Sequence, residues 1–359
     1  MRAAFEAFSP DLADPSTLAA DAALVGRTSA GPGLHVRGLA ALRGDGEWVR
    51  VGRNGFFGER STVHIAHGLH PATLGHDVTV GRFGLVHACT IEDGVVIGDA
   101  ATVMDGSVVG ANAVIAPGAL VPPRRTLPGG FVYAGAPAVA VREIGEKELA
   151  DVAGAIRAGA AHSLGAVDLP PLENSSFAVS GATHGPLLRA HGAAPSADEA
   201  FVAPNALLCG DVRLGVDAGV YYGCVLSAGG ARIAVGERSN VQDNTLIVTD
   251  ASRGDVVIGR EVTIGHNVRM GAGSFGDRSL IGMGSLVADG VVVEPGACIA
   301  AGSHVAPGTR VRAGWIWAGR PARALREVGE RERTMFASAV DIYVVYGATY
   351  RSGNAPIAA

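Results

Sequence analysis

Apolar residues recur at every sixth position through two long stretches of this chain. They are Ile97, Val103, Val109, Ile115, Val121, Leu127 and Tyr133 in the first stretch, and Ile281, Val287, Val293, Ile299, Val305, Val311 and Trp317 in the second. A period of six fits neither the 3.6-residue repeat of a helix nor the two-residue alternation of a simple strand. It fits a short strand and a tight corner, with one aliphatic side chain pointing inward on each face. Three faces close a coil of 18 residues, so the sequence predicts a mainly β fold, a β-helix of hexapeptide repeats.

Glycine is unusually frequent, with 52 of 359 residues, about twice the ~7% of an average protein. It often follows the inward apolar residue directly, as in Ile97-Gly98 and Ile281-Gly282. Because a positive φ costs glycine little, we expect these glycines to form the corners of the coils.

A larger repeat divides the chain into two copies. Residues 43–142 align with residues 227–326 at a constant offset of 184 and without a gap. The matched motifs include Asp105-Gly106 with Asp289-Gly290, and Ala134-Gly135-Ala136-Pro137 with Ala318-Gly319-Arg320-Pro321. We read the Ala-Gly-x-Pro motif as a turn that caps the end of each β-helix. The sequence therefore predicts a tandem duplication of one β-helical domain.

Each copy is followed by apolar residues at helical spacing. They are Leu149, Val152 and Ile156 after copy one, and Phe336, Val340, Tyr343, Gly347 and Tyr350 after copy two. Between the copies lies a stretch rich in Pro, Ser and Gly, which is typical of a linker. We predict copy one and its C-terminal α-helix over residues 1–163, a linker over 164–195, and copy two and its α-helix over 196–359.

Charge and composition exclude several classes of protein. The formal net charge is −5 and no long basic run occurs, so a nucleic-acid surface is not expected. No uninterrupted apolar stretch reaches 18 residues, so no membrane-spanning helix is expected, and the first residues show no secretory signal. The cysteines, which are Cys89, Cys209, Cys224 and Cys298, have no CxxC spacing. We expect reduced, buried thiols in a cytoplasmic protein.

Several motifs resemble those of the γ-class carbonic anhydrases. Copy one carries Leu42-Arg43-Gly44-Asp45, Ser61-Thr62-Val63-His64 and Val86-His87-Ala88-Cys89-Thr90-Ile91, and copy two carries Asn240-Val241-Gln242-Asp243-Asn244, Val262-Thr263-Ile264-Gly265-His266-Asn267 and Leu280-Ile281-Gly282-Met283-Gly284. The resemblance covers about residues 20–160 and 200–351. It implies two left-handed β-helices of parallel strands, with the handedness taken from the family.

The resemblance also implies a zinc site built from three histidines at a subunit interface, two from one subunit and one from its neighbour. The first, second and third ligand positions hold His64, Arg82 and His87 in copy one, and Val248, His266 and Gly271 in copy two. Neither copy keeps a complete set, but together they keep one set, His64, His87 and His266. Three imidazoles with an open fourth position are typical of catalytic zinc, although Fe²⁺ or Co²⁺ would also fit. Because His64 and Arg82 are 18 residues apart, we expect them to stack on successive coils.

Three further residues match functional positions of the family. Arg43 and Asp45 have Ser227 and Gly229 as their counterparts in copy two, and a structural ion pair is the alternative interpretation of this pair. Gln242 matches the family's glutamine, and its alternative role is to satisfy backbone groups at a corner. His67, His70 and His76 crowd a loop between two coils, where they would shuttle protons or simply be solvated.

The function implied is that of a zinc-dependent lyase or hydratase. Zinc would lower the pKa of a bound water to near 7, and the resulting hydroxide would attack CO₂ or a related electrophilic carbon. The expected partners are CO₂ and bicarbonate, or another small electrophile, and further copies of the chain in a homo-oligomer such as a trimer. Three alternatives stay open: a repurposed metal-dependent hydrolase or hydratase for another small molecule, a hexapeptide acyl-CoA transferase, and a metal-free scaffold.

Overall fold

The computed structural model describes residues 1–159, 187–189, 195–197, 199–353 and 356–357. The chain separates into two compact units. Unit 1 contains residues 1–183 and 355–359, and unit 2 contains residues 184–354. The predicted linker, residues 164–195, lies outside the described residues except for 187–189 and 195.

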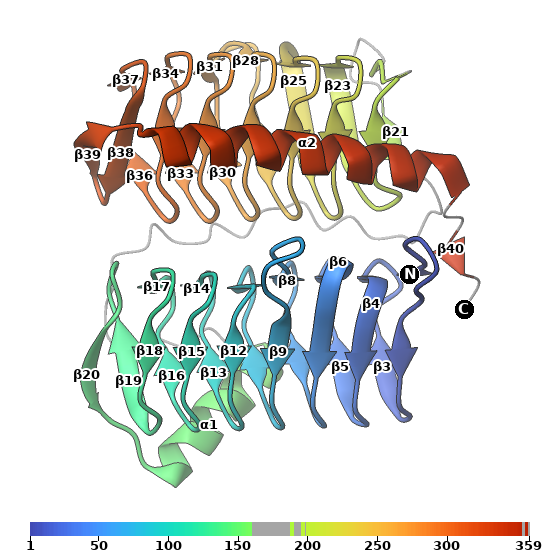
Figure 1. The fold of residues 1–359 in the computed structure, drawn as a ribbon, viewed down its shortest axis with the longest axis vertical. Coiled ribbons are helices and arrows are strands. Elements are labelled where there is room, and N and C mark those ends of the chain that lie inside the picture. The colour runs from blue at the N-terminus through green and yellow to red at the C-terminus, as the bar shows by residue number, and fades with distance from the viewer. Residues whose placement is uncertain (160–186, 190–194, 198, 354–355, 358–359) are drawn as a thin grey trace. The chain divides into compact units, whose positions relative to one another are not determined.

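Unit 1 is a left-handed parallel β-helix followed by a helix (Figure 1). Its elements are β1 (Arg2–Ala3), β2 (Asp11–Leu12), β3 (Ser16–Leu18), β4 (Ala23–Ala30), β5 (Leu34–Val36), β6 (Ala41–Val51), β7 (Phe56–Phe57), β8 (Thr62–His64), β9 (Ala72–Leu74), β10 (Thr79–Val80), β11 (Leu85–His87), β12 (Thr90–Ile91), β13 (Val96–Ile97), β14 (Thr102–Val103), β15 (Val108–Val109), β16 (Val114–Ile115), β17 (Leu120–Val121), β18 (Thr126–Leu127), β19 (Phe131–Ala134), β20 (Val139–Glu143), α1 (Glu146–Arg157) and β40 (Pro356–Ile357).

Unit 2 repeats this design and ends in a longer helix. Its elements are β21 (Leu187–Arg189), β22 (Phe201–Val202), β23 (Leu207–Leu214), β24 (Gly219–Val220), β25 (Val225–Val235), β26 (Asn240–Val241), β27 (Leu246–Val248), β28 (Val256–Ile258), β29 (Thr263–Ile264), β30 (Arg269–Met270), β31 (Gly273–Phe275), β32 (Leu280–Ile281), β33 (Leu286–Val287), β34 (Val291–Val293), β35 (Cys298–Ile299), β36 (His304–Val305), β37 (Arg310–Val311), β38 (Trp315–Gly319), β39 (Ala322–Glu327) and α2 (Glu330–Gly353).

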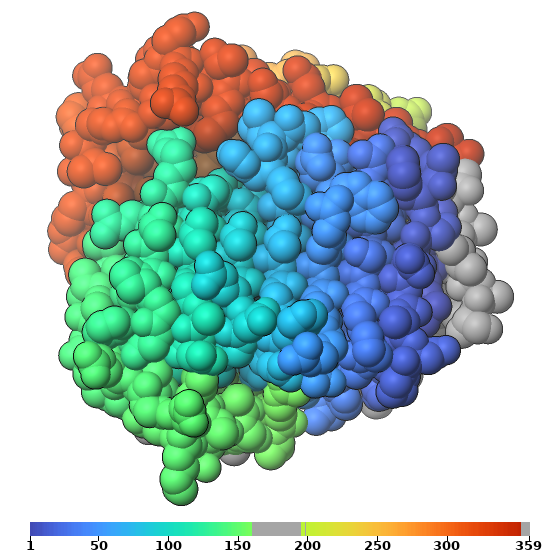
Figure 2. All heavy atoms as spheres, turned by 60° about the horizontal axis from the view of Figure 1, so that its bottom comes forward, coloured from blue at the N-terminus to red at the C-terminus, as the bar shows by residue number. Residues whose placement is uncertain are grey.

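The six-residue period produces the coils as predicted. In unit 1 each strand pairs in parallel with the strand one coil further on, so that Ile97 faces Ile115 and Val103 faces Val121. The coils follow one another in chain order from blue to green (Figure 2). All of the predicted inward residues are buried except Trp317, which is half-buried. One column of aliphatic side chains on each face therefore forms the core.

The corners do not form where the sequence analysis placed them. Gly98 follows Ile97 without a positive φ, and the left-handed residue of this corner is Ala100, with φ 54°. A Cβ on Gly98 would lie 2.6 Å from the backbone nitrogen of Pro117 on the next coil. Glycine is required at this position because two backbones approach closely, not because of its own φ angle.

Both predicted helices are confirmed, as α1 and α2. Before each helix the chain turns back as an antiparallel strand, with β19 pairing β20 and β38 pairing β39. Gly135 and Gly319 of the repeated Ala-Gly-x-Pro motif have φ angles of 97° and 103° in these turns, which is the capping role predicted for the motif. Within the described residues, no helix is long and apolar enough to cross a membrane.

Candidate metal centre

Three of the predicted site residues of copy one occupy the same place on three successive coils of unit 1. Arg43 on β6 pairs in register with His64 on β8, and His64 pairs with His87 on β11. Neighbouring parallel strands lie about 4.8 Å apart, so the three side chains stand beside one another. The parallel register therefore brings together residues that are far apart in sequence.

The predicted stacking of His64 on Arg82 is wrong. The residue of the next coil that pairs with His64 is His87, 23 residues further along the chain instead of 18. The loop between β8 and β9, in which Ala66 bridges to His70, contains the additional residues. Arg82 lies instead in the turn after β10, where its guanidinium pairs with Asp99.

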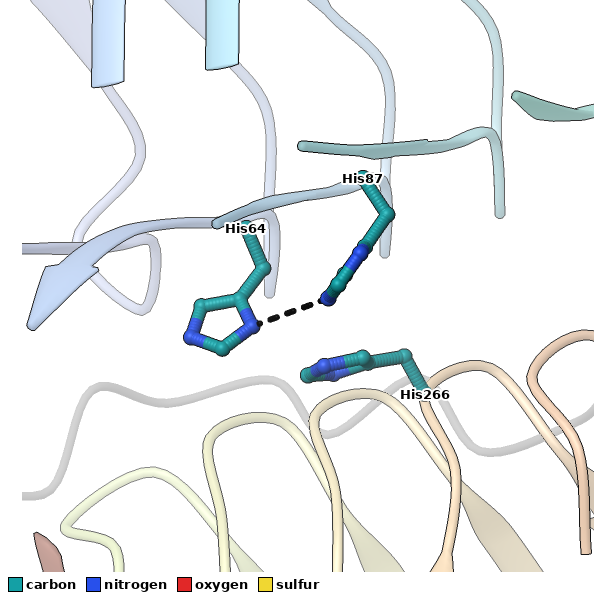
Figure 3. A group of neighbouring side chains, drawn as sticks. All are labelled: His64, His87 and His266. Atoms are coloured by element: carbon teal, nitrogen blue, oxygen red, sulfur yellow. Dashed lines mark hydrogen bonds between the residues drawn. The ribbon is translucent and has the colours of Figure 1, made fainter. Parts of the chain in front are cut away.

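The two histidines of unit 1 direct one ring nitrogen each toward the other (Figure 3). His64 Nδ1 lies 3.4 Å from His87 Nε2. Their remaining nitrogens contact carboxylates: His64 Nε2 lies 2.9 Å from Asp45 Oδ1, and His87 Nδ1 lies 2.6 Å from Asp105 Oδ1. An ionised carboxylate only accepts hydrogen bonds, so both of these outer nitrogens act as donors. This assignment leaves two lone pairs facing each other, an arrangement that favours a cation between them.

The 3.4 Å separation fits a shared metal ion. Two imidazole nitrogens at ~2.0–2.1 Å from a tetrahedral zinc lie about 3.3–3.4 Å apart. A carboxylate on the second nitrogen of a ligand histidine fixes its tautomer and its ring orientation. The pair His64 and His87, with Asp45 and Asp105 behind it, therefore has the donor set and the spacing of half a zinc site.

The carboxylates behind the histidines are themselves held in their charged form. Burial raises the pKa of the Asp105 carboxyl, but the charge that His87 carries when it is protonated and the hydrogen bond from His87 lower this pKa more, so that it lies below its usual value. Asp45 is fully buried and forms an ion pair with buried Arg43. Arg43 thus acts on His64 through Asp45. This geometry is compatible with a structural role and with a catalytic role of the Arg43–Asp45 ion pair.

His266 of unit 2 has the same kind of support. It lies in the turn after β29 (Figure 3), and its Nδ1 is 3.1 Å from Asp243 Oδ2. The other oxygen of Asp243 accepts the backbone N–H of Tyr222 at 3.0 Å. The contact between His266 Nδ1 and Asp243 is at ion-pair distance but does not have the geometry of a hydrogen bond. His266 Nε2 lies 3.2 Å from the hydroxyl of Tyr343 on α2. In turn, the backbone carbonyl of Tyr343 accepts a 2.6 Å hydrogen bond from Tyr221.

Gln242 lies in the turn after β26 and is buried. Its amide nitrogen donates to Asn240 Oδ1 at 3.1 Å, and Asn240 donates to Thr263 Oγ1 at 3.1 Å. Within the described part of the chain, the Gln242 side chain makes no hydrogen bond to a backbone group. The alternative role, in which Gln242 would hydrogen-bond backbone groups at a corner, therefore has no support. Gln242 belongs instead to a buried network of side chains with Asn240 and Thr263.

Two of the three ligand positions that lack histidine lie at guanidinium–carboxylate pairs, Arg82–Asp99 in unit 1 and Arg253–Asp289 beside Gly271 in unit 2. Asp289, the counterpart of Asp105, accepts Arg253 Nε at 3.0 Å and Nη2 at 2.8 Å. A Cβ on Gly271, the counterpart of His87, would collide with Asp289 Oδ1 and lie 2.6 Å from Arg253 Nη2. The guanidinium group of Arg253 thus occupies the space that a histidine side chain at position 271 would need in unit 2.

Two residues beside the histidines were not assigned to the site from the sequence. Asp105 follows His87 by 18 residues, one regular coil, and this phase was the signal that could have identified it. Tyr343 was recognised only as part of an apolar helical stripe. Nothing in the repeat period fixes which helical residue meets His266. In the loop before β10, His76 Nδ1 accepts the backbone N–H of Arg53 at 3.0 Å.

Comparisons with known proteins place these features in one family. The family profile described as "Bacterial transferase hexapeptide (six repeats)" matches residues 88–123. Gamma carbonic anhydrase 3, mitochondrial, of Arabidopsis thaliana is 44% identical over 178 residues, which cover 48% of this chain and 69% of that protein. A probable carbonic anhydrase of Methanocaldococcus jannaschii is 38% identical over 135 residues, covering 38% of this chain and 84% of that protein.

A solved structure, of a hexapeptide transferase family protein from Anaplasma phagocytophilum, is 42% identical and covers 46% of this chain and 98% of its own, with a TM-score of 0.44. The two sequence relatives match 48% and 38% of the present chain, as expected when two copies of one domain are joined. The identity to the plant protein over more than two thirds of its length shows the relationship. The chain belongs to the γ-carbonic anhydrase family.

Proposed function

We propose that this chain is a metal-dependent lyase that hydrates CO₂, with His64, His87 and His266 as the ligands of one zinc ion. The facing lone-pair nitrogens of His64 and His87 are the observation that carries the proposal. A zinc ion held there would supply a water of lowered pKa as the nucleophile for an electrophilic carbon. Fe²⁺ and Co²⁺ suit the same imidazole donors.

We propose His266 as the third ligand on two grounds that do not depend on how the units are arranged. Of its three ligand positions, copy two keeps histidine only at the second, His266, and this is the position at which copy one has Arg82. The Nδ1 of His266 lies 3.1 Å from Asp243 Oδ2, and a carboxylate beside one ring nitrogen of a histidine would orient the other nitrogen toward a metal. The third ligand would come from copy two of the same chain or of another chain.

The residues around the histidines would have distinct roles. Arg43 would hold Asp45, and Asp45 would orient His64. Gln242, fixed by Asn240, and Tyr343, beside Nε2 of His266, would offer polar groups to substrate or product. A homo-oligomer in the cytoplasm stays a prediction.

The test is CO₂ hydration by stopped-flow before and after removal of metal. We expect chelated protein to lose hydration activity and to regain it with one equivalent of Zn²⁺. Metal-free protein that transfers an acyl group from acetyl-CoA would instead identify a hexapeptide acyltransferase. Protein that neither binds metal nor hydrates CO₂ would identify a scaffold, and hydration that survives complete metal removal would refute the proposal.

A further inference from the structure

The outer surface of the unit 2 β-helix carries basic residues in a column that begins at Arg269, three residues after His266. Arg269 on β30, Leu286 on β33 and His304 on β36 pair in register on three successive coils. The next residue on each strand is a buried core residue, namely Met270, Val287 and Val305. Since successive side chains of a strand point to opposite faces, the side chains of the column point outward.

A third basic residue joins this column at the end of the β-helix. Arg320 Nε donates to the carbonyl of Gly302 at 2.7 Å, in the turn that leads into β36 and His304. Burial is the main cause that lowers the pKa of His304 to about 4, and the charges of Arg320 and Arg269 add to it. The pKa of Arg269 is lowered by burial and then by Arg320. The three residues are therefore close enough for the charges of Arg269 and Arg320 to repel each other and to disfavour protonation of His304.

Arg269 and His304 differ from most other basic residues of unit 2, because no ion pair with a carboxylate is formed by either of them in the part of the chain that the structure describes. Most of the others pair with a carboxylate, as in Arg232–Asp211, Arg253–Asp289, Arg310–Glu294, Arg326–Glu332 and Arg351–Asp217. Within the ranges that the structure describes, Arg269 and His304 form no ion pair. The positive charge on this face is thus not neutralised by a carboxylate bound to either residue.

Comparison of the copies shows that the cluster is specific to copy two. At the offset of 184, Arg269, His304 and Arg320 correspond to Leu85, Leu120 and Ala136. Copy one thus has an uncharged side chain at all three places in an otherwise equivalent coil. The coils do not need these charges in order to fold, so their joint presence on one face of copy two requires another explanation.

We propose that Arg269, His304 and Arg320 bind a small oxyanion, a carboxylate or a phosphate group. Guanidinium groups match both kinds of oxyanion through paired, charge-assisted hydrogen bonds. A bound anion would also remove the mutual repulsion of the cluster. The proposal concerns a second site on unit 2 and does not depend on the metal.

The experiment measures binding of inorganic phosphate and of acetate to the full chain by calorimetry, at constant ionic strength set with chloride. We expect phosphate or acetate to bind, and to bind equally after chelation, which separates this site from the metal centre. Arg269→Leu and Arg320→Ala, which restore the residues of copy one, should weaken binding about tenfold or more. Arg310→Ala, at an exposed arginine paired with Glu294, is the matched control and should bind as wild type does.

Arg269→Lys is the second variant, because it keeps the charge and loses the planar fork. It should bind more weakly than wild type and more tightly than Arg269→Leu. The proposal is overturned if neither anion binds, if Arg269→Leu and Arg320→Ala bind as tightly as wild type, or if only an acidic polypeptide such as polyglutamate binds.

Discussion

At the scale of single residues, each predicted ligand histidine rests on an aspartate. Asp45 holds His64, Asp105 holds His87, and Asp243 holds His266. The sequence motifs identified the histidines and Asp45, but no role was assigned to Asp105. The position of Tyr343 beside His266 depends on how α2 packs, which the motifs do not encode.

Replacing Asp105 should weaken the metal site without removing a ligand. Asp105→Asn removes the charge behind His87, and loss of such a support typically lowers metal affinity about 10–100-fold. Asp289→Asn is the matched control, since Asp289 is the counterpart in copy two and holds Arg253. We expect competition titration with a zinc chelator to show weaker binding only for Asp105→Asn. Equal affinities for both variants would contradict this role of Asp105.

His304 should contribute a measurable dependence of stability on pH. Its pKa is about 4 in the folded chain, below its ordinary value of ~6.5. As pH falls through ~6.5 the unfolded chain takes up a proton at His304, but the folded chain does not until about pH 4. The free energy of unfolding therefore falls across this interval.

The variant His304→Leu carries the residue that copy one has at this place. Its free energy of unfolding should fall less between about pH 6.5 and pH 4 than that of wild type, because the contribution of His304 is removed. Urea denaturation between pH 7 and pH 4, in buffers free of phosphate and carboxylate, measures it. His70→Leu, at an exposed loop residue, serves as the control. A decline as steep in His304→Leu as in wild type would show that His304 is not the group concerned.

At the scale of elements, the six-residue period predicted the strands and the core column, and the apolar residues at helical spacing predicted the two helices. The period could not place the corner residues, because a glycine in this repeat can be required by a close approach of two backbones and not by a positive φ angle. Gly98 avoids a clash with the next coil, whereas the left-handed corner is formed by Ala100. Regular spacing also failed across the loop between β8 and β9, where the coil is longer and His64 stacks on His87.

The close approach at Gly98 predicts a loss of stability on substitution. Gly98→Ala places a Cβ 2.6 Å from the backbone nitrogen of Pro117, and overpacking of this kind costs about 1–3 kcal/mol. Gly154→Ala is the control, since no atom of the neighbouring coils lies within 4 Å of its Cβ and the residue is in α1. That change should stabilise by about 0.5–1 kcal/mol. Chemical denaturation measures the free energy of unfolding, which should be lower for Gly98→Ala and higher for Gly154→Ala than for wild type. An unchanged free energy of unfolding in Gly98→Ala would contradict the account.

At the scale of the whole molecule, the constant offset predicted the duplication, and the family resemblance predicted that the two copies have lost complementary ligands. The sequence could not show what replaced them. Arg253 and Asp289 fill the third position of copy two, and Arg82 pairs with Asp99 at the second position of copy one. Both pairs join residues from different coils, at contacts that only the folded register creates. They leave one intact set of histidines, so we expect one metal ion per chain.

Metal analysis of purified, folded variants tests the central claim most directly. His64→Ala and His266→Ala, 202 residues apart in sequence, should each reduce zinc from about one ion per chain to a trace. His35→Ala, at a histidine that stacks on Phe56 and lies on β5, in a different sheet from β8 and β11, should keep zinc and activity. Loss of metal in both ligand variants and its retention in the control is the result that we predict. Full zinc occupancy and CO₂ hydration in His266→Ala would show that the site is not shared between the two copies.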